Sequence, residues 1–140
     1  RLCDMNPKTL EFDARRLAEV ADSEVLCVLA THLLGIGVDV PRVAGLCHPQ
    51  GIFVVEDVAQ AFGGKCDGKP FGSLGDVSFL SFGRGKNITC GSGGAILTND
   101  DRIGEALAQE YAQLPDESLA GRLKNWLEVA VTQWLSHPSR

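Results

Sequence analysis

The sequence predicts a three-layer α/β domain with a mixed, mostly parallel sheet, and three observations support this fold class. Residues 25–31 and 52–55 are continuously apolar and rich in β-branched side chains, which is typical of parallel strands buried on both faces. Further strand patterns occur at 77–82 and 95–98, and helical patterns alternate with the strands. Only about twelve irregular residues separate the last two strands, too few for a helical crossover, so we expect the last strand to run antiparallel.

Capping residues and apolar periodicity indicate where the helices and turns lie. Asp13 is a good N-cap, and Pro41 suits the first turn of a helix. Pro115 ends one helical pattern before another begins. We expect helices at residues 14–21, 41–48, 58–62, 101–114 and 116–135, and a small hairpin at 65–70.

Composition indicates a folded domain and excludes several classes of function. Of the 140 residues, 44% are apolar and 22% are charged, which is ordinary for a globular domain. Thirteen Lys and Arg against eighteen Asp and Glu give a formal net charge of −5, which argues against nucleic-acid binding. The longest apolar run, residues 25–30, is far shorter than the roughly 20 residues that a membrane-spanning helix needs.

The five cysteines are widely separated in the sequence. Cys3, Cys27, Cys47, Cys66 and Cys90 form neither a CxxC pair nor the close spacing of zinc ligands, so we expect no metal site. An odd number of such cysteines suits free thiols in a reducing compartment, and we expect a cytoplasmic protein.

The two ends suggest a longer protein. The chain begins with Arg1 rather than Met, and residues 136–140 follow a helical pattern directly, with no closing element. We therefore expect the sequence to be a segment of a larger domain.

Two polar residues that follow buried strands, Lys86 and Asp57, indicate a particular chemistry. The phosphate-binding motifs GxxxxGK[ST] and GxGxxG are both absent, although glycine is abundant. Lys86 lies in a glycine-flanked loop, where apolar surroundings can make lysine a nucleophile; a solvated surface lysine is the alternative. Asp57 either caps a following helix or faces a cationic ring nitrogen. A Schiff-base lysine and an aspartate opposite a pyridinium nitrogen are what pyridoxal phosphate requires.

Four segments resemble the DegT/DnrJ/EryC1/StrS sugar aminotransferases. They are ATHLLG at 30–35, VVEDVAQAFG at 54–63, GSLGDVSFLSFGRGK at 72–86 and NITCGSGGAILTND at 87–100. The resemblance extends over about residues 1–110 and implies the fold type I architecture of pyridoxal-phosphate enzymes. It also implies that residues 1–140 are part of the large domain, without the N-terminal cofactor-binding part and the C-terminal small domain.

The resemblance assigns roles to five residues. Lys86 matches the lysine that forms the Schiff base with pyridoxal phosphate, and Ser81 matches a donor to the cofactor's phosphate. Asp57 matches the carboxylate that pairs with the pyridine nitrogen, and Gln60 matches the glutamine beside the ring and its phenolic oxygen. His32 matches a position near the site, although a core histidine is an equally good interpretation.

The same resemblance implies an aminotransferase that moves an amino group, with glutamate as donor, onto a keto-sugar carried by a nucleotide. It implies a homodimer and no nucleic-acid or membrane partner. Two alternatives stay open: a sugar dehydratase, although the known ones have histidine in place of the lysine, and a non-catalytic or truncated relative. The sequence departs from the family pattern at Ser92, where glutamate is usual, and at Arg84, where smaller residues are usual.

Overall fold

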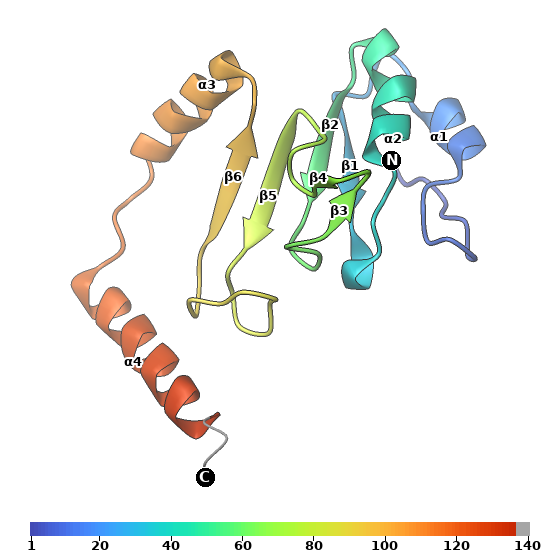
Figure 1. Ribbon diagram of the computed structural model, residues 1–140. Helices are drawn as coiled ribbons and strands as arrows, with labels where there is room; N and C mark the ends of the chain where they lie inside the picture. Colours follow the sequence, from blue (N-terminus) through green and yellow to red (C-terminus); the bar gives the residue numbers. More distant parts are fainter. Residues whose placement is uncertain (137–140) are drawn as a thin grey trace.

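The computed structural model describes residues 1–136, and residues 137–140 at the chain end lie outside the described part (Figure 1). The helices are α1 (Ala14–Val20), α2 (Val40–Cys47), α3 (Asp101–Ala112) and α4 (Leu119–Leu135), with short 3-10 helices η1 (Leu33–Gly35) and η2 (His48–Gln50). The strands are β1 (Cys27–Thr31), β2 (Phe53–Asp57), β3 (Lys65–Cys66), β4 (Lys69–Pro70), β5 (Val77–Ser81) and β6 (Gly94–Thr98).

The main sheet confirms the predicted α/β class and strand directions. Its order is β1-β2-β5-β6, in which β1, β2 and β5 are parallel and β6 is antiparallel to β5. The short link between β5 and β6 therefore has the consequence expected from its length. Strands β3 and β4 form the expected small antiparallel hairpin.

The strands differ from the expectation that both of their faces are buried. In β1, Val28 and Ala30 are buried whereas Leu29 is 50% exposed, and in β2, Val54 is buried whereas Phe53 is 46% exposed. The reason is that α2, which lies across β1 and β2 in Figure 1, packs with α1 against the alternate side chains on one side. We call this side the covered face, with Val28, Ala30, Val54, Glu56, Ser78 and Leu80, and the other the open face.

The expected helix at 58–62 is wrong, because this segment forms turns. The N–H of Val58 donates to the carbonyl of Phe79 (3.0 Å) and so continues the ladder between β2 and β5. The N–H of Ala61 then donates to Val58 O (3.1 Å), a bond between residues three apart that closes a turn. The N–H of Gly64 donates to Ala61 O (3.0 Å) in the same way, so the segment forms successive turns rather than an α-helix.

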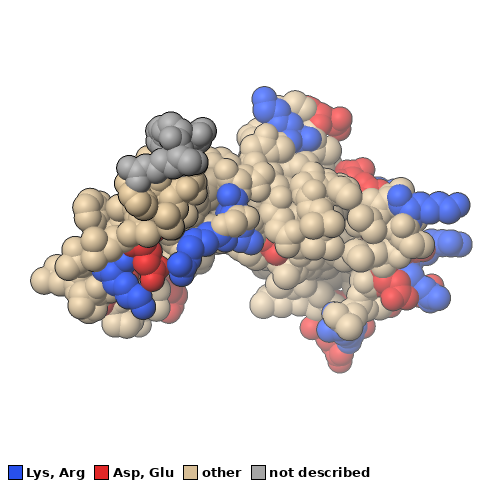
Figure 2. All heavy atoms as spheres, turned by 90° about the horizontal axis from the view of Figure 1, so that it is seen from below, with Lys and Arg blue, Asp and Glu red and all other residues tan. Residues whose placement is uncertain are grey.

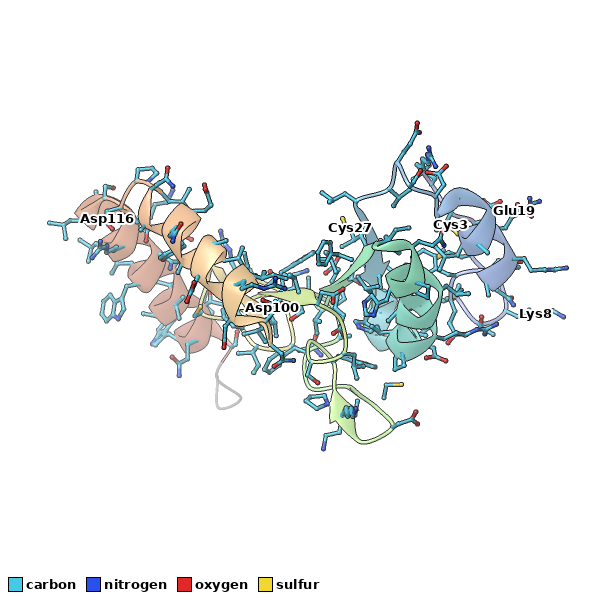
Figure 3. The ribbon with its side chains drawn as sticks, turned by 90° about the horizontal axis from the view of Figure 1, so that it is seen from above. Cys3, Lys8, Glu19, Cys27, Asp100 and Asp116 are labelled. Carbon is cyan, nitrogen blue, oxygen red and sulfur yellow. The ribbon has the colours of Figure 1, made fainter. Side chains whose placement is uncertain are left out.

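The other helices lie close to the expected ranges. Asp13 caps α1 by accepting the N–H groups of Arg15 and Arg16, as predicted. At the start of α3, Asp100, which is labelled in Figure 3, accepts the N–H groups of Arg102 and Ile103 in the same way. Figures 1 and 3 show that α3 and α4 lie at the end of the sheet opposite α1.

Helix α4 begins three residues later than expected and contacts the loop between β5 and β6. Ser118 sets its start by accepting the N–H of Gly121. Glu128 forms an ion pair with Arg84 (3.3 Å), and a Cβ added at Gly91 would lie 2.6 Å from a side chain of α4. Within residues 1–136, no helix has the length and apolar character needed to cross a bilayer.

The core has two parts on the covered face. The larger part joins α1, α2 and the first two strands through Leu17, Ala21, Val28, Ala30, Val38, Val40, Val43, Ala44, Cys47, Ile52 and Val54. The smaller part comprises Val58, Ala61 and Leu80. All five cysteines are free thiols, as predicted, and burial raises the pKa of the Cys47 thiol.

We expect Gly94→Ala to destabilise the protein strongly. An added Cβ would lie 2.4 Å from the carbonyl oxygen of Leu80, which belongs to the neighbouring strand β5 and cannot move away without disturbing the β5–β6 ladder. The expected loss is about 2–3 kcal/mol in the free energy of unfolding, measured with urea. Gly104→Ala is the matched control, because its Cβ would stand an ordinary 3.6 Å from Thr98. Equal losses in the two variants would contradict the prediction.

Candidate active site

The carboxyl ends of the three parallel strands meet at one edge of the sheet. Figure 2 views the molecule from this side, where acidic and basic side chains are scattered among a larger area of other residues. In the strand register, Thr31 lies beside Asp57, and Asp57 lies beside Phe79. Ser81 is two residues beyond Phe79, so Asp57 and Ser81 both point to the open face at the ends of adjacent strands.

Side-chain hydrogen bonds tie together the loops that follow these strands. The Oε1 atom of Gln60 accepts the N–H of Leu34 (3.2 Å), which joins the loop after β2 to the loop after β1. The Nδ2 atom of Asn87 donates to the carbonyl of Phe62 (3.4 Å), which joins the loop after β2 to the loop after β5. Lys86 is the immediate neighbour of Asn87, so its backbone is held close to Phe62, two residues after Gln60.

Hydrogen bonds join the two ends of the loop that carries Lys86. The N–H of Phe82 donates to Gly93 O (2.9 Å), and the carbonyl of Phe82 accepts from Cys90 N–H (3.0 Å) and the hydroxyl of Thr89 (3.1 Å). Lys86 is half-buried, and its ammonium has no hydrogen bond or ion pair within residues 1–136. No group of the described residues therefore holds the end of this side chain in place.

Asp57, Ser81 and Gln60 each keep one polar group unused. Asp57 Oδ1 accepts the N–H of Ala59 (3.0 Å) and so caps a turn rather than the expected helix, and Oδ2 has no hydrogen bond in the described residues. Ser81 Oγ accepts from Gly83 N–H (3.4 Å), so its hydroxyl hydrogen can still be donated. Gln60 uses its oxygen for Leu34, which leaves its amide hydrogens. These groups suit a ligand with a cationic ring nitrogen, a phosphate and an oxygen acceptor.

His32 lies inside the protein rather than at the open face. The ring is fully buried and stacks on Phe71, with centroids 4.1 Å apart and the planes inclined by 18°. Its Nδ1 atom accepts the N–H of Val38 (3.0 Å), and its Nε2 atom lies 3.1 Å from Glu56 Oε2. Both ring nitrogens are engaged, which favours the core-histidine interpretation over contact with a cofactor.

Glu56 is the residue of this region that the sequence reasoning missed. Its carboxylate is fully buried and accepts bonds from three backbone N–H groups in addition to His32, namely those of Gly72, Leu74 and Gly75 (2.9, 2.7 and 2.6 Å). Burial alone would raise the pKa of Glu56, but these bonds together outweigh it and lower the pKa. The available signal was a carboxylate in an apolar strand on the face opposite Asp57.

Known proteins resemble this chain in sequence. The model of the DegT/DnrJ/EryC1/StrS aminotransferase family matches residues 1–120. GDP-perosamine synthase from Escherichia coli O157:H7 is 30% identical over 126 residues, which are 90% of this chain and 34% of that protein. The chain thus spans about a third of the length of this relative.

Solved structures resemble it in fold. The aminotransferase TlmJ from Streptoalloteichus hindustanus has a TM-score of 0.71 at 34% identity, and the likeness covers 76% of this chain and 29% of that one. A GDP-4-keto-6-deoxy-D-mannose-3-dehydratase from E. coli, with bound hydrated PLP, has a TM-score of 0.69 at 24% identity, over 76% and 27%. An aminotransferase and a dehydratase share this fold, so the fold alone does not choose between the two reactions.

We expect the Glu56 carboxylate to contribute stability that depends on pH. Because its pKa in the folded protein is lowered from 4.5, the contribution is present above that pH and is lost as the pH falls through the folded-state pKa. Glu56→Gln should be less stable than the wild type by about 3 kcal/mol at neutral pH. Urea unfolding at several pH values should show this gap narrowing on acidification. Other carboxylates titrate equally in both proteins, so a gap independent of pH would refute the assignment.

Proposed function

Because the chain belongs to the DegT/DnrJ/EryC1/StrS aminotransferase family, we propose that it forms the cofactor-binding core of a pyridoxal-phosphate aminotransferase. The observation that supports this most is the tie between the Lys86 loop and the loop after Asp57. That tie lies at the sheet edge where ligands bind in α/β proteins.

The unused polar groups fit pyridoxal phosphate. Lys86 Nζ would attach to the carbonyl carbon of the cofactor, and Asp57 Oδ2 would pair with the ring nitrogen. The amide hydrogens of Gln60 would donate to the phenolic oxygen, and the hydroxyl of Ser81 would donate to the phosphate. When bound, the cofactor supplies a conjugated cationic ring that accepts electrons from a bond breaking at the substrate carbon. Lys86, once displaced by the amino donor, would carry the proton to and from that carbon.

The substrate proposal is a nucleotide-linked keto-sugar, with glutamate as the amino donor. It is supported by relatives such as GDP-perosamine synthase, whose name describes an amino sugar carried by a nucleotide. In the full-length protein we expect a cytoplasmic homodimer in which further segments complete the site. Those segments would supply the aromatic side chain that stacks on the ring and the backbone donors for the phosphate.

Lys86 favours transamination over the dehydratase alternative. In the resemblance described above, the known dehydratases have histidine where the aminotransferases have this lysine. The sequence keeps Asp57, Gln60 and Ser81 together with Lys86, which also favours a catalytic protein over a non-catalytic relative.

The covalent attachment is tested with Lys86→Ala in the full-length protein. We expect pyridoxal phosphate followed by borohydride to leave a permanent mass increase on the wild type, located on the peptide that contains Lys86. The variant should show no such increase, because the attaching amine is gone. Lys69→Ala, in the exposed hairpin, is the control and should label normally. Label elsewhere than Lys86 would disprove this role.

The ring-nitrogen contact is tested with Asp57→Asn. Asparagine keeps the shape and can still accept the N–H of Ala59, so thermal stability should barely change. The loss of charge should leave the ring nitrogen unprotonated for more of the time. Single-turnover transamination should therefore fall by at least about 100-fold, or on the order of 3 kcal/mol in the barrier. Near-normal turnover would show that Asp57 only caps the turn.

A further inference from the structure

The contacts of His32 determine where its proton lies. Val38 donates its backbone N–H to Nδ1, so Nδ1 must present a lone pair. The single ring proton then lies on Nε2 and is donated to Glu56 Oε2. An imidazolium ring would place a second proton on Nδ1, directly against the N–H of Val38. His32 is therefore held in one neutral tautomer beside a charged Glu56.

The surroundings of Glu56 accept nothing except a carboxylate. Oε1 accepts two N–H groups from Leu74 and Gly75, and Oε2 accepts from His32 and Gly72. Three of these donors are peptide N–H groups, and Val38 fixes the fourth as a donor. In either orientation, the amide NH₂ of a glutamine would face two donors. No glutamine rotamer with this geometry satisfies the site.

The same two residues hold the backbone at Asp57. Successive side chains in a strand point to opposite faces, so Glu56 anchored on the covered face directs Asp57 to the open face. His32 contacts both residues: its ring hydrogen-bonds the side chain of Glu56, and its backbone N–H donates to the carbonyl of Asp57 (3.0 Å). The side chain of Glu56 and the backbone of Asp57 are therefore both bonded to the same residue.

We propose that Glu56 and His32 act together as positioning residues that present Asp57 to the ring nitrogen of the bound cofactor. This inference rests on the proposed function, since it needs pyridoxal phosphate to bind beside Asp57. Neither residue touches the cofactor. Their role is to fix the end of β2 by a buried, fully satisfied hydrogen-bond network on the opposite face of the sheet.

The first test compares Glu56→Gln with Ile52→Ala in the full-length protein. Ile52 is buried just before β2 and lies outside the network, so its truncation gives a comparable loss of stability without touching Glu56. Pyridoxal-phosphate affinity is measured by absorbance titration well below both melting temperatures. We expect Glu56→Gln to weaken binding by about tenfold or more, because misplaced positioning groups have effects of this size, while Ile52→Ala stays near the wild type.

The second test is the ¹⁵N spectrum of His32 in the cofactor-free protein. We expect the pattern of a ring with its proton on Nε2 and a lone pair on Nδ1. If Glu56→Gln fails to fold, Glu56→Asp replaces it in the first test. Aspartate keeps the negative charge but has a shorter side chain, so we expect it to weaken pyridoxal-phosphate binding to a smaller degree than Glu56→Gln.

The outcomes separate this proposal from the proposed function. A wild-type protein that does not bind pyridoxal phosphate would overturn the proposed function, and the positioning role with it. Wild-type binding with equal losses in Glu56→Gln and Ile52→Ala would overturn the positioning role alone. A protonated His32 or a proton on Nδ1 at neutral pH would overturn the fixed tautomer.

Discussion

A carboxylate that is buried away from water needs hydrogen-bond donors from the protein, and Glu56 is such a carboxylate. Burying such a charge costs several kcal/mol unless its lone pairs are satisfied. The loop from Gly72 to Gly75 turns its N–H groups inward to meet it, and a Cβ at Gly75 would already lie 2.8 Å from the carbonyl of Val54. The close approach of this loop, the orientation of His32 and the end of β2 all follow from one buried charge.

The two faces of the sheet differ in how their polar side chains are bonded. The covered face holds a polar network with every partner inside the protein, beneath the packing of His32 on Phe71. The open face holds Asp57 and Ser81, each with a polar group left unused. Because strand side chains alternate, a single strand end can serve both purposes with adjacent residues, Glu56 and Asp57.

The sequence was informative where local patterns decide the outcome. The parallel strands were predicted from their apolar runs, and the antiparallel direction of β6 from the short link before Gly94. The sequence also placed Asp57 and Ser81 at the ends of strands. Two expectations failed because tertiary contacts decided them. An apolar strand has the same sequence pattern whether one face or both are covered. At 58–62, Val58 continues the sheet ladder and the chain then closes successive turns between residues three apart instead of a helix. The role of Glu56 could not be predicted because three of its four hydrogen-bond partners are backbone N–H groups, and every residue type except proline has one.

The spacing of the Glu56 partners has a consequence for how the chain folds. His32 is 24 residues before Glu56, and the three backbone donors are 16 to 19 residues after it. Closing loops of this length has a modest entropic cost, which rises only slowly with length. Every group that the buried charge needs therefore comes from residues 32–75, upstream of β5, β6 and the Lys86 loop. During synthesis from the N-terminus, all four donors to Glu56 are present before the ribosome reaches Lys86.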